Sequence, residues 1–176
     1  MPDTPASDPV SHLLADGGGI PNNPDLPALL YRGAVDPPAG DPARAFEDLF
    51  ARHGWTGSWR DGIYPFHHFH STAHEVLGIA RGRVRARLGG EGGISVELAA
   101  GDVVVLPAGT GHKNEGASPD LLVVGAYPDG QEPDLRRGGP GERPRVLANI
   151  AAVPLPAADP VRGPDGPLVR LWRAGR

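Results

Sequence analysis

Hydrophobic and polar residues alternate through the centre of the chain, which is typical of half-buried β-strands. Every second residue is apolar in segments 83–88 and 94–98, and the glycine-rich segment 89–93 between them predicts a hairpin loop. In this pairing the arginines of the first segment lie opposite Ser95 and Glu97. We therefore interpret them as solvated cross-strand pairs rather than as a phosphate-binding patch.

Two continuous apolar runs that follow this hairpin predict more deeply buried strands. They cover residues 103–106 and 121–127, and residues 26–35 predict a first strand. Short strands at close spacing, separated by glycine turns, favour a barrel or jelly roll. The expected fold class is therefore mainly β, with a jelly-roll barrel.

One segment follows the helical period. Residues 41–53 begin with Asp41 as the expected N-cap and Pro42 at the first helical position, and Gly54 ends the helix. An apolar stripe at helical spacing is formed by Phe46, Leu49 and Phe50. We expect this to be the one helix of the chain, packed against the core.

The two ends of the chain lack the regular alternation of apolar and polar residues found in its centre. Residues 1–24 are polar and aperiodic, so we expect an N-terminal arm that is loose or wraps the domain. Residues 25–176 are expected to form a single domain, with a core barrel at about 62–127 and a C-terminal extension at 128–176. In that extension, residues 128–145 predict a surface loop, and residues 146–156 and 167–172 predict proline-punctuated edge strands.

Composition excludes several classes of function. The net charge of -4, without a basic stripe, argues against a nucleic-acid or anionic-membrane partner. The absence of cysteine excludes disulfides, Fe–S clusters and a thiol nucleophile. The chain has neither a signal-peptide pattern nor an apolar run of about 20 residues, the length of a membrane span, so we expect a cytoplasmic protein.

Three histidines and one glutamate have a spacing with chemical meaning. His68 and His70 lie two residues apart and share one face of an extended strand, whereas Glu75 needs an intervening corner to join them. Ser71 and Thr72 are plausible turn residues for that corner. His112, some forty residues later, can reach the other three only in a folded sheet. Nitrogen and oxygen ligands of this kind suit a borderline divalent metal.

Other polar residues near this pattern are weaker candidates. Strand alternation sends His67 and His74 to the opposite face. Asn114 could make a hydrogen bond behind the ligands, and Tyr64 or Tyr127 could supply a phenol for proton transfer, although such a tyrosine is more often a packed core or interface residue. These three are the candidate catalytic residues. Neither a phosphate-binding glycine loop nor a Gly-x-Ser-x-Gly elbow occurs.

The spacing Gly62-x5-His68-x-His70-x4-Glu75-x6-Gly82 resembles the first motif of the cupin superfamily, and Gly101-x5-Pro107-x-Gly109-x2-His112 resembles its second. The second motif usually closes with asparagine four residues after its histidine, where this chain has Gly116. The wider sequence, including GSWRDGIYPFHHFHSTAHEVLG and PAGTGHKN, resembles a bacterial single-domain cupin family whose members mostly lack an assigned reaction.

The resemblance implies a small jelly-roll barrel with a metal at its mouth. It implies His68, His70, Glu75 and His112 as ligands of one divalent transition metal per chain, with Fe(II) favoured and Mn, Ni, Cu or Zn possible. Four protein ligands leave about two positions of an octahedral ion free for a small-molecule substrate, water or O₂. Exposed edge strands and proline-rich termini favour a homodimer.

Three classes of function are compatible with such a site. The first is a metal-dependent oxidoreductase of the dioxygenase type. The second is an isomerase, epimerase or lyase in which the metal polarises a carbonyl while a side chain moves a proton. The third is a binding module without catalysis. We favour the first because the ligands are all nitrogen or oxygen and because the family resemblance points the same way, although one fold hosts many chemistries.

Overall fold

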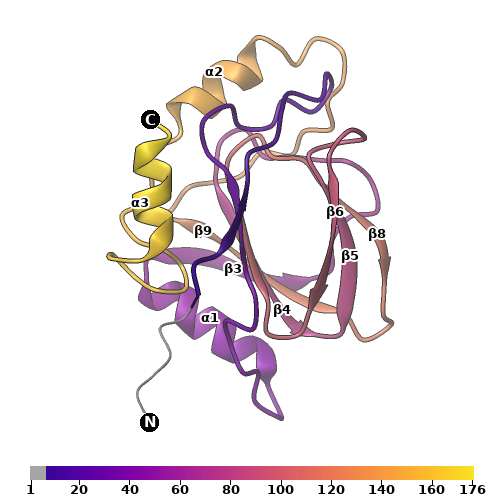
Figure 1. Ribbon diagram of the computed structural model, residues 1–176. Coiled ribbons are helices and arrows are strands. Elements are labelled where there is room, and N and C mark those ends of the chain that lie inside the picture. Colours follow the sequence, from indigo (N-terminus) through magenta and orange to yellow (C-terminus); the bar gives the residue numbers. More distant parts are fainter. Residues whose placement is uncertain (1–6) are drawn as a thin grey trace.

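The computed structural model describes residues 7–176, in which nine strands form two antiparallel sheets that face each other as a double-stranded β-helix (Figure 1). The larger sheet has the order β1-β2-β7-β4-β9-β3 and the smaller one β6-β5-β8. The nine strands of the two sheets are β1 (Val10–His12), β2 (Ala28–Tyr31), β3 (Trp55–Asp61), β4 (Glu75–Arg81), β5 (Arg83–Leu88), β6 (Ile94–Ala99), β7 (Val103–Leu106), β8 (His112–Ala117) and β9 (Leu122–Pro128). The predicted fold class is confirmed.

The predicted hairpin is confirmed in position and register. Arg85 of β5 lies opposite Glu97 of β6, and Arg87 lies opposite Ser95. Their polar groups meet on the outside of the small sheet around Glu115 of β8, whose carboxylate lies 2.9 Å from Arg87 Nε and accepts a hydrogen bond from the Ser95 hydroxyl at 2.7 Å. Such exposed pairs contribute little stability, so this face is a solvated surface.

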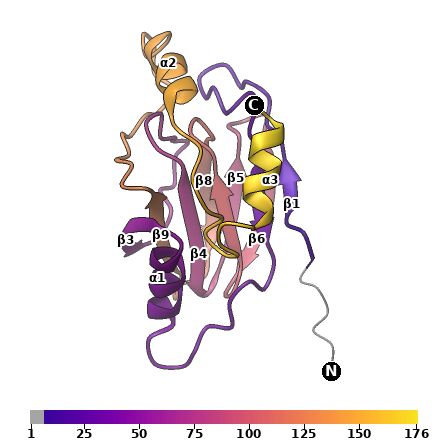
Figure 2. The same cartoon turned by 90° about the vertical axis from the view of Figure 1, so that its left-hand side faces the viewer.

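The core is divided into two layers by the large sheet. Strand β4 alternates between them, with Leu77 and Ile79 inside the barrel and Val76 and Ala80 on the outer face. The outer layer is closed by helices α1 (Pro42–Arg52) and α3 (Pro167–Ala174), which lie along the large sheet (Figure 2). It buries large aromatic side chains, namely Phe46, Phe50, Trp55 and Trp172.

Helix α1 (Pro42–Arg52) matches the predicted helix in position. Asp41 precedes it, but its carboxylate makes no capping hydrogen bond and instead accepts from the guanidinium of Arg60. The helix packs against β4 where Gly78 has no side chain. A Cβ at this glycine would lie 2.3 Å from Phe46 Cδ1, so the close approach requires glycine.

The predictions of two C-terminal edge strands and of a single helix are wrong. The structure has helices α2 (Arg145–Ala152) and α3 (Pro167–Ala174) there, which gives three helices in the described part of the chain. Pro167 occupies the first turn of α3, where proline needs no hydrogen-bond donor. The buried side chains Leu168 and Trp172 lie four residues apart, which is the helical spacing that the prolines obscured.

The N-terminal arm wraps the barrel. Its first six residues lie outside the described part, and Val10–His12 form β1 on the edge of the large sheet, a short strand that the sequence did not predict. Buried Asn22 then ties the arm to the barrel rim, donating to Gly89 O at 3.1 Å and accepting from Gly111 N at 3.0 Å. The strand expected at residues 26–35 is shorter, at Ala28–Tyr31.

In residues 7–176 no helix combines the length and apolar character needed to span a bilayer.

Candidate metal centre

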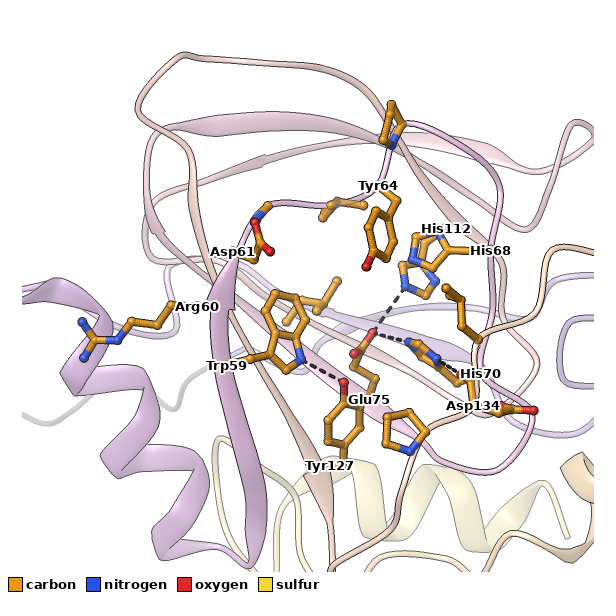
Figure 3. A pocket seen from close by; sticks show the side chains of 16 residues that line it. Trp59, Arg60, Asp61, Tyr64, His68, His70, Glu75, His112, Tyr127 and Asp134 are labelled. Carbon is orange, nitrogen blue, oxygen red and sulfur yellow. Dashed lines mark hydrogen bonds and ion pairs between the residues drawn. The ribbon is translucent and has the colours of Figure 1, made fainter.

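A cavity of about 420 Å³ opens at one end of the barrel, between the two sheets. Its floor is polar and its walls are largely aromatic or apolar (Figure 3). All four predicted ligands line it. The surrounding wall consists of Trp59, Arg60, Asp61, Gly62, Ile63, Tyr64, Pro65, Leu77, Tyr127, Pro133, Asp134 and Leu135.

The fold brings His70, Glu75 and His112 together. Glu75 begins β4 and points inward with Leu77, while the Nε2 atoms of both histidines lie 3.3 Å from its Oε1 (Figure 3). The ligand atoms of these three residues lie within 4.8 Å of one another. This group could hold a metal ion.

His68 lies beside this group without belonging to the most compact set. Its backbone forms a two-way bridge with His112, which holds the two imidazoles at a centroid separation of 4.0 Å. The His70 ring is farther away, with its centroid 6.1 Å from that of His68. His68 is 4% exposed and lines the cavity, so it is part of the site. The ligand atoms of His70, Glu75 and His112 nevertheless form a tighter group without His68 than with it.

Hydrogen bonds fix the tautomer of all three histidines. A carbonyl oxygen only accepts, so each Nδ1 that contacts one must carry the proton. The carbonyls that accept from His68, His70 and His112 belong to Phe66, Asp134 and Thr110 respectively. Each Nε2 of a neutral ring therefore carries a lone pair, and those of His70 and His112 face Glu75. This is the arrangement that orients metal-binding histidines.

The charges of the site fit a divalent cation. Glu75 is 2% exposed, and burial by itself would raise its pKa, but the two neighbouring histidines hold the pKa below its ordinary value. Burial and the neighbouring His112 lower the pKa of His68 to about 3, so its ring stays neutral. The buried carboxylate needs a positive partner. Burial opposes a charge on His70, but Glu75 raises the pKa of His70 above its ordinary value, so a proton on this ring can supply that charge in the metal-free protein. A divalent cation would replace this proton and bind the freed lone pair. Nitrogen and oxygen ligands about 2.1 Å from an ion lie roughly 3.0–3.4 Å apart, which matches the distance of 3.3 Å from Glu75 Oε1 to each of the two Nε2 atoms.

The three candidate catalytic residues occupy different positions. Tyr127 lies in the wall, where Trp59 Nε1 donates to its hydroxyl at 2.8 Å, and burial followed by the charge of Glu75 raises its pKa. Tyr64 is 53% exposed at the mouth and stacks on Phe66. Asn114 does not line the cavity, and its side chain accepts from Gly116 N at 2.7 Å.

His67 and His74 lie outside the cavity, on the sides that strand alternation predicts. His67 Nε2 lies 3.0 Å from the exposed carboxylate of Glu91. His74 is fully buried under α3, where its Nδ1 accepts from Ala108 N at 2.9 Å and its Nε2 faces Pro154 O at 3.2 Å.

Sequence reasoning missed the contribution of residues 131–136. This segment falls in the predicted surface loop, yet it lies against the corner that carries His70, and Asp134 contacts both the ligand and the turn. The corner at Ser71 and Thr72 is confirmed, because both backbone amides donate to the Asp134 carboxylate. No periodic signal marks such a segment, since its role arises from contacts more than 60 residues apart in the chain.

A curated protein of Bacillus subtilis, the uncharacterised protein YjlB, is 41% identical to the chain over 162 residues, which cover 92% of this chain and 95% of YjlB. No family model matches the chain.

Solved structures resemble parts of the fold. Acireductone dioxygenase from Bacillus anthracis, with a cadmium ion in its active centre, is 20% identical over 52% of this chain and 63% of its own, at a TM-score of 0.37. An uncharacterised double-stranded β-helix protein of Klebsiella pneumoniae is 15% identical over 74% of this chain and 81% of its own, at a TM-score of 0.33. The matched region covers less than two thirds of the dioxygenase chain.

Proposed function

The chain belongs to the protein family of YjlB and is a cupin, and from that premise we propose that it is a metal-dependent oxidoreductase of the dioxygenase type that acts on a small uncharged molecule. The observation that carries the proposal is the convergence of the Nε2 atoms of His70 and His112 on the buried carboxylate of Glu75 at the floor of an open cavity. His68, His70, Glu75 and His112 would hold the metal. A bound Fe(II) would supply free coordination positions for substrate and O₂.

The residues of the chain itself would orient the substrate and exclude water. Trp59 and Tyr127 form one wall, fixed by their mutual hydrogen bond, and Tyr64 stands opposite at the mouth (Figure 3). Because the indole N–H donates to the Tyr127 oxygen, the phenolic proton is free to point to Glu75 or to a substrate oxygen. Tyr127 would therefore hold a proton beside the reacting atoms.

Charge in the wall supports an uncharged substrate. Arg60 is the one arginine or lysine among the residues that line the cavity, and its guanidinium turns away to bind Asp41 and Glu47 beside α1 (Figure 3). Asp61 leaves an exposed carboxylate at the mouth. A phosphate or a dicarboxylate would find no fixed cation here other than the metal, and phosphate recognition needs such groups.

An isomerase, epimerase or lyase is the second candidate, and the position of Tyr127 favours it. The raised pKa of Tyr127 means that this phenol keeps its proton beside the ligands, where it could donate a hydrogen bond to a substrate oxygen without any oxidant. O₂ dependence therefore distinguishes the two proposals.

The test is oxygen consumption by iron-loaded protein with a panel of neutral vicinal diols and hydroxyketones, compared with sugar phosphates of similar size. We expect uptake that depends on a neutral compound and is abolished by His112→Ala. Turnover of the same compounds without O₂ would identify an isomerase or lyase. Thermal stabilisation by a compound without any product would identify a binding module.

A further inference from the structure

Two segments that are distant in the sequence form a tight unit beside the site. We define the strap as residues 131–136 and the ligand corner as residues 69–74, which carries His70 and leads into Glu75. The segments join through a backbone bridge between Phe69 and Arg136, with N–O distances of 2.9 and 3.0 Å. Thr72 adds two bonds, donating to Glu132 O at 2.7 Å and accepting from Asp134 N at 3.0 Å.

Asp134 is the centre of this unit. Its carbonyl accepts the proton of His70 Nδ1, and its carboxylate accepts from Ser71 N at 2.6 Å, from the Ser71 hydroxyl, from Thr72 N at 3.3 Å and from Arg136 Nε at 2.9 Å. Four donors satisfy this carboxylate, so it is engaged with the protein and is not a free group of the cavity wall. The residue thus holds the strap in place with its side chain while its main chain orients a candidate ligand.

The unit is also anchored from the helical side. Asn149 of α2 donates to the Ser71 hydroxyl at 3.1 Å. Gln131 accepts from His74 N at 3.0 Å and donates to Pro154 O at 3.2 Å. Helix α2 therefore supports the ligand corner through Ser71, and the strap is fixed at both of its ends.

From this geometry we propose that Asp134 is a positioning residue for the metal centre. It sets the tautomer and direction of the His70 ring, and it seats Pro133 and Leu135 in the cavity wall. Metal affinity and the shape of the substrate wall then depend on the same side chain. This inference rests on the proposed metal site.

The physical reason is that a ligand histidine must present Nε2 along one direction. When the carbonyl partner of Nδ1 shifts, the ring is free to rotate and both tautomers become accessible, so part of the binding energy is spent on ordering. Outer partners of this kind typically change metal affinity about 10–100-fold when they are removed. A segment that only covered the barrel would change stability without this effect.

The experiment compares Asp134→Asn and Asp134→Ala with Glu132→Gln, a matched control that removes one charge from the same strap. Glu132 enters the unit through its carbonyl alone, so its side chain can change without loss of a strap contact. The measurement is the Zn²⁺ dissociation constant of each full-length protein, obtained by competition with a chromogenic chelator. A ring ¹⁵N spectrum of the metal-free protein reports the His70 tautomer, and urea unfolding reports stability separately.

We expect Asp134→Asn to weaken Zn²⁺ binding about 10–100-fold and to mix the His70 tautomers, with Glu132→Gln unchanged. If Asp134→Ala fails to fold, Asp134→Asn and Ser71→Ala provide the same comparison, with a smaller effect expected for Ser71→Ala because it removes one of the four donors. Affinity within twofold of the wild type in all folded variants would overturn the positioning role. A wild-type protein that binds no divalent metal would instead overturn the proposed function.

Discussion

The start of strand β4 presents two adjacent buried polar residues with opposite surroundings. His74 faces the helical layer, where both of its ring nitrogens meet backbone groups and Trp172 covers the ring at a centroid distance of 4.8 Å. Glu75 faces the barrel, where the partners of its carboxylate are histidine nitrogens and the tyrosine of the wall.

The difference separates a structural histidine from a candidate ligand. His74 uses both nitrogens inside the protein, so it needs nothing else. His70 and His112 each use one nitrogen to hold a backbone carbonyl and aim the other at a shared point. His112 and Glu75 are buried almost as completely as His74, so hydrogen-bond satisfaction, rather than depth, distinguishes the two regions.

The largest effect is expected from a substitution of Glu75, the buried carboxylate inside the barrel. Glu75→Gln takes away the buried charge, and we expect the content of divalent metal to fall from about one per chain to below a tenth, because the cation loses its main electrostatic partner. Elemental analysis after anaerobic reconstitution measures it. His67→Ala is the control, since His67 pairs with exposed Glu91 outside the cavity and its loss should leave the metal content unchanged. Equal metal in Glu75→Gln and wild type would contradict the site.

The second prediction concerns a substitution of His74, whose ring faces the helical layer. His74→Ala leaves Ala108 N without its partner, removes one of the two hydrogen-bond partners of Pro154 O and opens a cavity beside Trp172, so we expect a loss of about 2–4 kcal/mol in the free energy of unfolding. Urea unfolding of the metal-free protein gives the value. Zn²⁺ affinity should change less than tenfold. A variant with wild-type stability and no metal binding would reverse the assignment of the two histidine classes.

The smallest effect tests the packing of the helical layer alone. Gly78→Ala places a Cβ against the Phe46 and Phe50 rings, and we expect a loss of about 1–3 kcal/mol by overpacking. Thermal and urea unfolding measure it. Gly92→Ala is a suitable control because no atom lies within 4 Å of its Cβ position and its φ is not positive. If Gly78→Ala binds Zn²⁺ with wild-type affinity, packing of the helical layer does not affect the metal site inside the barrel. A large loss of affinity would show that the two regions are coupled.

Much of the barrel could be predicted from local pattern. Alternation placed the hairpin at 83–98 in its observed register, and the apolar run at 103–106 coincides with β7. Glu75 shares its strand parity with Leu77 and Ile79, which lie in the inner core, so local sequence also fixes the face to which the carboxylate points. The C-terminal helices were missed because their prolines favour strand edges and helix starts alike, and local sequence does not choose between them.

The sequence by itself determined which side chains share a face, because strand period and motif spacing are properties of neighbouring residues. It also determined the chemical character of the candidate ligands, since residue type fixes the donor atoms. Only the tertiary structure decided that the rings of His68 and His112 lie 4.0 Å apart and that Asp134 supports His70. Those relations join segments some 40 to 60 residues apart, and such contacts depend on how the sheets close and where a loop without periodicity comes to rest.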